Sequence, residues 1–227
     1  MNRREFLTAT CLVLTSGKIL KDVCENEYEK YLINKIYSLP EYTILAKHKF
    51  TLEEDRIKEN QGYGIIINQQ YYTFAHIFEK EEMIKTPFGY IKIPLDVKEE
   101  EHTIYGKKLE KVVCDYEKDI AIFNLSSDLN LPNFPAEPSD ELFLGDEVYI
   151  VGNPSLEGPN IRKANISRVN ALGVNGEKNA GYFGVDKIII PGDSGTPVVS
   201  KDFKLLGLSS FVKWDLGYIK KIGEFNK

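Results

Sequence analysis

A serine between glycines gives the strongest chemical signal in the chain. Ser194 lies in the string PGDSGTP, residues 191–197, after Gly192 and before Gly195. Glycines let the backbone turn sharply, so that the serine hydroxyl and the neighbouring N–H groups face one point. Acyl transfer needs that arrangement, because its tetrahedral oxyanion must meet preorganised donors. The same string would also suit a tight turn between two strands, so it does not decide the function alone.

A histidine and an aspartate earlier in the chain would complement this serine. His76 ends the string YTFAH, at the end of an expected strand, whereas His48 and His102 stand among charged residues and are expected to be solvent-exposed. Asp119 directly precedes the apolar run 120–123. It would either end a turn or be carried inward to fix the tautomer of a histidine. The order His, Asp, Ser is one of the known orders of a catalytic triad.

Composition excludes several other classes of protein. The 227 residues are 42% hydrophobic and 28% charged, which is ordinary for a globular protein and argues against disorder. A net charge of −5 disfavours binding to a nucleic-acid backbone. No apolar run reaches the length of about 18 residues that a transmembrane helix needs. Three widely spaced cysteines, Cys11, Cys24 and Cys114, exclude a disulfide scaffold and a zinc ribbon.

The first 22 residues are interpreted as an export signal or an N-terminal anchor. Arg3 and Arg4 precede Phe6, Leu7 and a short apolar stretch, which is the layout of a twin-arginine signal. An amphipathic helix is the simpler alternative. Export would place the protein in the periplasm or outside the cell, and an uncleaved N-terminus would tether it to a membrane. In an oxidising compartment Cys24 and Cys114 would be able to pair.

The rest of the chain is expected to be almost entirely β. A helix and a lead-in strand are predicted within residues 23–60, with the helix ended by Pro40 and a solvated loop at 53–60. From residue 62 short β-branched and aromatic runs alternate with turn residues, which favours antiparallel barrels or sandwiches. We predict a first β-barrel at 61–130, a proline-rich linker at 131–140 and a second barrel at 141–227.

Together, the motifs resemble those of the chymotrypsin-like (trypsin-fold) serine proteases, and most closely the bacterial HtrA-like branch. The similarity extends from about Gly62 to Val212. The segments that carry it are YTFAH (72–76), DYEKDIAIF (115–123), GDEVYIVGNP (145–154), PGDSGTPVV (191–199) and LLGLSSFV (205–212). Five motifs in the right order are far more specific than any one of them.

This resemblance implies an all-β fold of two six-stranded antiparallel β-barrels, with a short N-terminal helical segment and the active site between the barrels. It implies a serine endopeptidase in which Ser194 is the nucleophile, His76 the general base and Asp119 the residue that orients it. The N–H groups of Gly192 and Ser194 would form the oxyanion hole, and Ser210 would support the aspartate. Protein or peptide substrates are expected, with no metal, no organic cofactor and no nucleic acid.

Several details depart from the family pattern. No Ile-Val-Gly-Gly stretch lies upstream, so the partner that Asp193 has in the trypsin branch is missing and its partner here is open. The chain ends 33 residues after Ser194, which predicts that no PDZ domain follows. The family alignment places Ile188, Phe211 and Val212 in the substrate pocket. Apolar residues there favour small or medium apolar side chains before the cleaved bond.

Two alternatives remain at this point. One is a catalytically silent, protease-like binding module, and the other is an esterase that uses the same triad. The oligomeric state is left open by the sequence.

Overall fold

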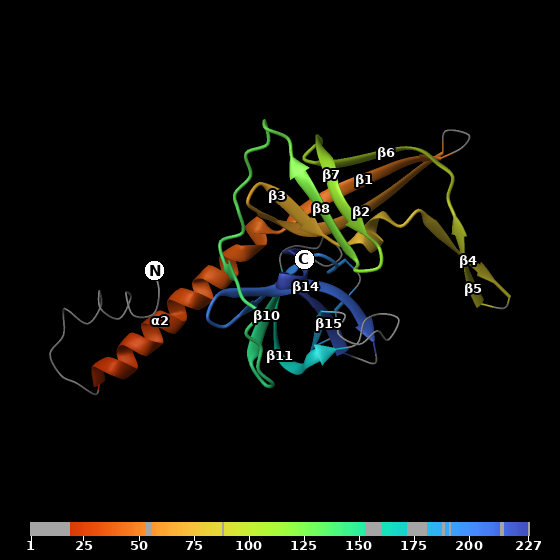
Figure 1. Cartoon of the computed structure of the whole chain (residues 1–227). Helices are drawn as coiled ribbons and strands as arrows, with labels where there is room; N and C mark the ends of the chain where they lie inside the picture. Colours follow the sequence, from red (N-terminus) through yellow and green to blue (C-terminus); the bar gives the residue numbers. More distant parts are fainter. Residues whose placement is uncertain are drawn as a thin grey trace.

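Two closed β-barrels that stand one above the other form the body of the described chain (Figure 1). The computed structural model describes residues 19–52, 56–87, 89–152, 160–171, 181–187, 189–190, 192–213 and 216–226. The expected signal at 1–22 therefore lies mostly outside the described residues. Ile188 also lies outside them.

The first barrel closes through six antiparallel strands in the order β1-β2-β3-β8-β7-β6. The strands are β1 (Ile44–Leu52), β2 (Ile57–Ile67), β3 (Gln70–Thr73), β6 (Val97–Ile104), β7 (Lys107–Asp115) and β8 (Ile120–Leu125). Every second residue of β1 is buried, from Ile44 to Leu52. This period of two is what a strand with one face toward the barrel interior must show.

The second barrel closes in the same way. Its strands are β10 (Glu147–Gly152), β11 (Asn160–Ala171), β12 (Tyr182–Val185), β13 (Pro197–Ser200), β14 (Lys204–Lys213) and β15 (Leu216–Lys221). β13 pairs with both β10 and β14, which completes a ring of six, and the short β9 (Glu137–Pro138) adds to β14 in parallel. The predicted fold class of two six-stranded antiparallel barrels is confirmed.

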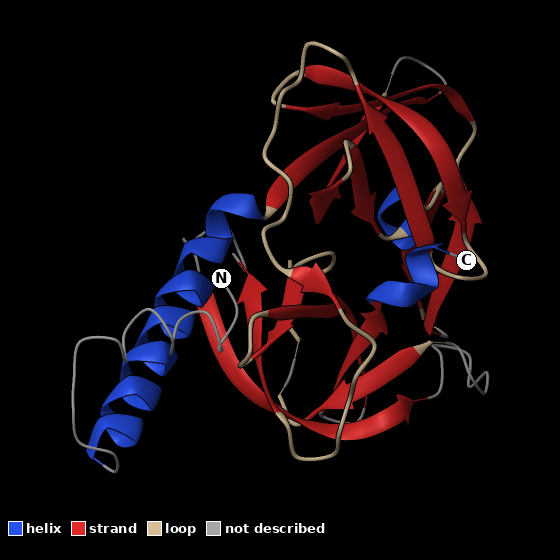
Figure 2. Ribbon diagram, turned by 60° about the vertical axis from the view of Figure 1, so that its left-hand side comes forward, coloured by secondary structure: helices blue, strands red, loops and turns tan. Residues whose placement is uncertain are grey.

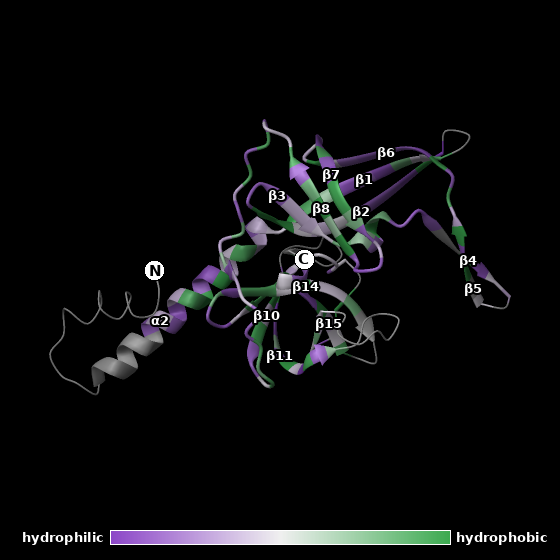
Figure 3. Cartoon of the chain, in the orientation of Figure 1, coloured by the Kyte–Doolittle hydropathy of each residue, from purple (hydrophilic) through white to green (hydrophobic). Residues whose placement is uncertain are grey.

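A helix and a hairpin stand outside the barrels. α2 (Ile19–Ser38) and the turn η1 (Leu39–Tyr42) run along one side of the molecule, and only the C-terminal part of α2 packs on the body, through Leu32 and Ile36 (Figure 2). β4 (Glu81–Thr86) and β5 (Gly89–Pro94) form a separate two-stranded hairpin that projects sideways in Figure 1. Among the described residues no helix is apolar over enough of its length to span a membrane. Figure 3 shows hydrophilic and hydrophobic residues interspersed along the coloured part of α2.

One hydrophobic cluster joins the two barrels. The larger cluster of buried residues joins first-barrel strands to Val151, Val199, Leu205 and Leu208 of the second barrel. The segment between the barrels contributes Phe134, whose N–H donates to Ile66 O at 2.7 Å. A second cluster fills the interior of the second barrel. Because apolar side chains join the barrels, their relative position is fixed by packing.

Two segments differ from the expectation. β1 belongs to the first barrel, although the sequence placed it in a lead-in segment before residue 61. β2 begins at Ile57, inside the stretch that we expected to be a solvated loop. None of its residues 57–61 is buried and all but Ile57 are polar, because this end of the strand extends beyond the packed interior.

The expectation that His48 and His102 are solvent-exposed is wrong. Their exposed fractions are 0% and 6%, and they face each other across β1 and β6, with the two Nδ1 atoms 3.1 Å apart. The rings of Phe78 and Phe123 pack against both. Their charged neighbours in sequence misled the prediction, because adjacent residues of a strand point to opposite faces.

Candidate active site

The cleft side of the first barrel presents His76 from a single helical turn. β3 ends at Thr73, and η3 (Ala75–Phe78) follows it. Ala75, Ile77 and Phe78 are buried, whereas the His76 side chain is 35% exposed. The three buried neighbours anchor the turn and leave the imidazole partly exposed.

Asp119 lies beside this imidazole because β3 and β8 are paired. Thr73 is opposite Ala121 in that register, which brings the start of β8 next to η3. Asp119 has a φ of 55°, in the left-handed region that aspartate tolerates better than most residues. Its carboxylate accepts a hydrogen bond from the His76 backbone N–H at 2.9 Å. The carboxylate oxygens also lie 2.9 and 3.0 Å from His76 Nδ1.

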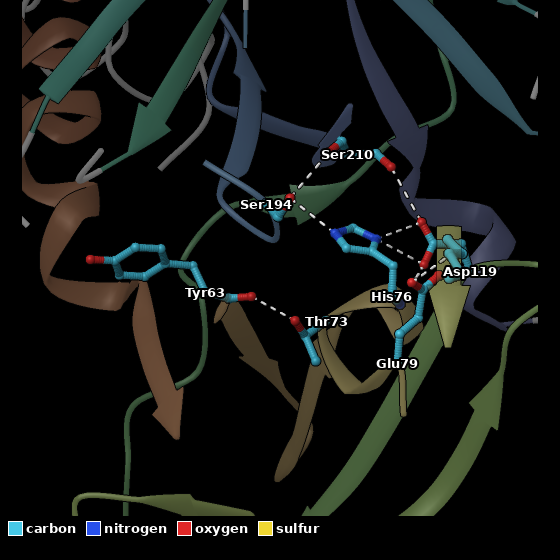
Figure 4. A network of polar contacts seen from close by, with 8 residues as sticks. Tyr63, Thr73, His76, Glu79, Asp119, Ser194 and Ser210 are labelled. Atoms are coloured by element: carbon cyan, nitrogen blue, oxygen red, sulfur yellow. Dashed lines mark hydrogen bonds and ion pairs between the residues drawn. The ribbon is translucent and has the colours of Figure 1, made fainter. Parts of the chain in front are cut away.

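Ser194 reaches the same point from the second barrel. Its Oγ lies 3.0 Å from His76 Nε2 and 3.1 Å from the backbone oxygen of Ser210 (Figure 4). With Nδ1–H donated to the carboxylate of Asp119, Nε2 is free to accept the hydroxyl proton of Ser194. A continuous polar chain therefore runs from Asp119 through His76 to Ser194.

Ser210 approaches both ends of this chain. It lies in β14, at the register shift between Ser209 and Phe211. Bulges of this kind re-aim a side chain out of the regular alternation. The Ser210 hydroxyl donates to Asp119 Oδ2 at 3.4 Å, a long hydrogen bond.

The loop that carries Ser194 is fixed against the first barrel. Tyr63 N–H donates to Ser194 O at 3.1 Å, and Thr73 Oγ1 donates to Tyr63 O at 2.6 Å. Gly195 has a φ of 86°, and a Cβ there would lie 1.6 Å from Tyr63 O. Only glycine permits this approach, so the contact between the loop and the first barrel requires a glycine at position 195.

Two backbone donors of the loop have no backbone acceptor among the described residues. The N–H groups of Asp193, Gly195 and Thr196 bind the carbonyls of Ile190, Ser209 and Asp193. The N–H groups of Gly192 and Ser194 bind no carbonyl of a described residue. Gly192 has a φ of 99° and is exposed. These two amides are the ones expected from the sequence to form the oxyanion hole.

The expected pocket residues are only partly described. The Phe211 ring stacks on Tyr218 with centroids 4.6 Å apart and meets Tyr182 edge-on at 5.3 Å. Val212 is opposite Gly217 in the β14–β15 register, but its side chain lies outside the described residues, as does Ile188. The structure thus brings together His76, Asp119, Ser194 and Ser210, but does not describe all three pocket positions.

Sequence reasoning missed Thr73 and Tyr63, which hold the loop in place. Thr73 stands inside the motif YTFAH, but the motif does not show what its hydroxyl binds. No group of three or more His, Cys, Asp or Glu side chains in the described ranges is arranged to hold a metal ion. Cys114 forms no disulfide with any described residue, and the Cys24 side chain lies outside them.

Comparisons with known proteins agree with this geometry. The model of the family described as "Trypsin-like peptidase domain" matches residues 62–208. A probable periplasmic serine endoprotease, DegP-like, from Buchnera aphidicola subsp. Schizaphis graminum is 28% identical over 154 residues. The periplasmic serine endoprotease DegP of Escherichia coli K12 is 25% identical over the same length. Each alignment covers 66% of this chain, and the chain spans about 30% of the length of each relative.

A solved structure shares the fold. The active form of the Rv3671c protease from M. tuberculosis superimposes with a TM-score of 0.57 at 19% identity, covering 86% of this chain and 83% of that chain. The family match includes strands of both barrels and the segments of His76, Asp119 and Ser194, and it spans more than half of the sequence. The chain therefore belongs to the family of trypsin-like peptidases.

Proposed function

We propose that the protein is a serine endopeptidase that cleaves peptide bonds through an acyl-enzyme. The observation that carries the proposal is the polar chain Asp119–His76–Ser194, with distances of 2.9 Å and 3.0 Å between the side chains, beside two unengaged amides. An aspartate, a histidine and a serine in that contact are the parts that acyl transfer needs.

Each residue has one step in the proposed mechanism. His76 Nε2 removes the proton from Ser194 Oγ as that oxygen attacks the substrate carbonyl. The N–H groups of Gly192 and Ser194 stabilise the tetrahedral oxyanion. His76 then gives the proton to the leaving amine, and the acyl-enzyme remains on Ser194 Oγ. In the second half, His76 removes a proton from water as the water oxygen attacks the acyl carbonyl. The bond to Ser194 Oγ then breaks, and His76 returns the proton to that oxygen. Asp119 holds the Nδ1–H tautomer and stabilises the imidazolium.

Labelling with a fluorophosphonate probe and cleavage of casein test this function. Ser194→Ala should abolish labelling and lower casein cleavage by about 10⁴-fold or more, because triad members act as a unit. Ser127→Ala, an exposed serine, is the matched control and should behave like wild type. Casein cleavage by the Ser194→Ala variant at the wild-type rate would refute the assignment. No labelling of the wild type would favour the silent binding module, and turnover of esters without peptides would favour the esterase.

A preference for small or medium apolar side chains before the cleaved bond is part of the proposal. Its support is the apolar character of Ile188, Phe211 and Val212 in the motif alignment. A cationic side chain would be buried without a counter-charge in such a pocket. A peptide library varied at that position should favour Ala, Val and Thr; preference for Arg, Lys, Phe or Tyr would exclude this pocket.

Export is also part of the proposal. Arg3 and Arg4 precede an apolar stretch, and relatives over the protease segment are named as periplasmic endoproteases. Changing both arginines to lysine keeps the charge but removes the guanidinium groups that define the twin-arginine route. We expect the exported fraction to fall on cell fractionation; equal amounts outside the cytoplasm would reject that route. Recovery of the full-length chain in the membrane fraction would support an uncleaved N-terminal tether.

A further inference from the structure

The residue directly before Ser194 is a fully buried carboxylate. Asp193 is 0% exposed, and its Oδ2 accepts hydrogen bonds from the Ile190 backbone N–H at 2.8 Å and from a terminal nitrogen of Arg162. The backbone of Asp193 is engaged as well, because its N–H binds Ile190 O and its carbonyl accepts from Thr196 N–H. The side chain and backbone of Asp193 thus connect Ile190, before Ser194, with Thr196, after it.

The cation comes from a different strand, far away in sequence. Arg162 lies on β11, 31 residues before Asp193, and is opposite Ile150 in the β10–β11 register. Its side chain is 19% exposed. In the described part of the chain it is the one ion-pair partner of Asp193. Asp193 Oδ1 is buried with no hydrogen-bond partner there, so this carboxylate has little other compensation for its lost hydration.

The position of Asp193 links its side chain to the two oxyanion donors. The peptide unit that carries the Ser194 N–H begins at the carbonyl carbon of Asp193, and Gly192 is the residue before it. Without a paired cation, the cost of the buried charge would favour loop conformations that bring the Asp193 carboxylate toward solvent. A change in the φ or ψ of Asp193 in such conformations would turn the Ser194 and Gly192 amides away from their present directions. A glycine at 192 offers no steric resistance to such a change.

We propose that Arg162 is a positioning residue for the oxyanion hole. Its guanidinium neutralises buried Asp193 and thereby holds loop 190–196 in the conformation that points the Gly192 and Ser194 amides into the cleft. An internal side chain therefore fills the role that the sequence left open for Asp193. This inference rests on the proposed protease function of the same site.

The first test compares Arg162→Met with Arg168→Met, an exposed arginine on the same strand. The rate of fluorophosphonate labelling of Ser194 should fall about 100-fold in Arg162→Met, the effect of losing an oxyanion donor. The fall should lie in kcat rather than KM for a peptide substrate. Arg168→Met should stay within about twofold of wild type, because exposed arginines away from the site contribute little.

Two further variants separate charge from shape. Arg162→Lys keeps a positive charge without the planar fork and should lose about 10-fold, between wild type and Arg162→Met. If Arg162→Met does not fold, the labelling rate of Arg162→Lys tests the inference in its place. Asp193→Asn in the Arg162→Met background should recover part of the labelling rate, because no uncompensated buried charge remains.

A readout that needs no catalysis keeps the inference distinct from the proposed function. Amide hydrogen exchange at Asp193 and Thr196 should be about 10-fold faster or more in Arg162→Met than in wild type or Arg168→Met, with β10 amides unchanged. If the wild type is not labelled, the protease proposal fails and exchange alone decides the role of Arg162. Wild-type exchange in the loop, or wild-type labelling despite faster exchange, would overturn the inference.

Discussion

Mild acid should destabilise the protein through the buried pair His48 and His102. Burial, and for His48 also the neighbouring His102, lowers the pKa of His48 to about 3 and that of His102 to about 4, from an ordinary 6.5. Around His102, Glu100 opposes this effect, with its carboxylate 3.9 Å from Nε2, whereas Lys111 and Lys80 add to it. Only one Nδ1 of the pair carries a proton, because one must donate to the other.

The sign follows from the lowered pKa values. The unfolded chain binds protons at these two residues below about pH 6.5, while the folded chain stays neutral down to about pH 4. The contribution of the pair to stability is therefore fully present above about pH 6.5 and is lost as the pH falls toward 4. Between about pH 6.5 and 4.5, each histidine is protonated in the unfolded chain and neutral in the folded one. Over these two or so pH units the free energy of unfolding falls by about 1.4 kcal/mol per unit for each histidine, which gives about 5 kcal/mol for the pair. That loss is of the same order as the whole stability of many domains.

Urea unfolding at a series of pH values between about 7.5 and 4.5 measures this effect. The comparison is with the double variant His48→Leu/His102→Leu, since replacing both partners of a buried hydrogen bond by apolar groups is often nearly neutral. Its free energy of unfolding should depend on pH less than that of wild type, by about 5 kcal/mol over this interval. Any packing cost of leucine appears equally at every pH and cancels in the slope. Parallel curves for the two proteins would refute the reasoning.

Three other substitutions test the loop and its anchors. Gly195→Ala should lower the free energy of unfolding by more than about 3 kcal/mol, because the new Cβ would overlap Tyr63 O. Gly106→Ala is the control, since Gly106 has a similar φ and open space around it, and it should lose only about 1 kcal/mol. Thermal melts of both variants measure the difference. Thr73→Val removes the hydroxyl that donates to Tyr63 and should cost about 1–3 kcal/mol by urea unfolding; an unchanged midpoint would show that the bond is dispensable. Asp119→Asn should leave thermal stability nearly intact and reduce turnover by about 10⁴-fold, and a reduction below tenfold would remove it from the mechanism.

The sequence predicts well what short motifs encode. The strings around His76 and Ser194 specify a local backbone: a strand end in one case and a glycine-flanked turn in the other. Antiparallel pairing then follows from the alternation of buried and exposed residues, which is visible in β1 from Ile44 to Leu52. Local patterns therefore predicted antiparallel barrels or sandwiches, whereas the two barrels and the meeting of the three segments between them were expected from the resemblance to the chymotrypsin-like proteases.

Contacts across strands were not predictable in the same way. Asp193 lies in the motif 191–199, whereas Arg162 lies outside every motif, and nothing in the sequence around either residue indicates the other as its partner. The burial of His48 depends on which face of β1 turns inward, a question of register that charged neighbours hide. The β4–β5 hairpin reads as ordinary strands in the sequence, because its separation from the barrels is a property of pairing and not of composition.

The contact between Tyr63 and the Ser194 loop has a consequence for biosynthesis. His76 and Ser194 are 118 residues apart in sequence, and the loop is held in part by a strand of the other barrel. A growing chain on the ribosome therefore has its first barrel complete long before it has Ser194, the proposed nucleophile. Ser194 in turn gains its anchor only when the second barrel docks. Hydrolytic competence would appear only after the second barrel has been synthesised, in one step with the closure of the interface. Incomplete chains would be inert toward the proteins around them.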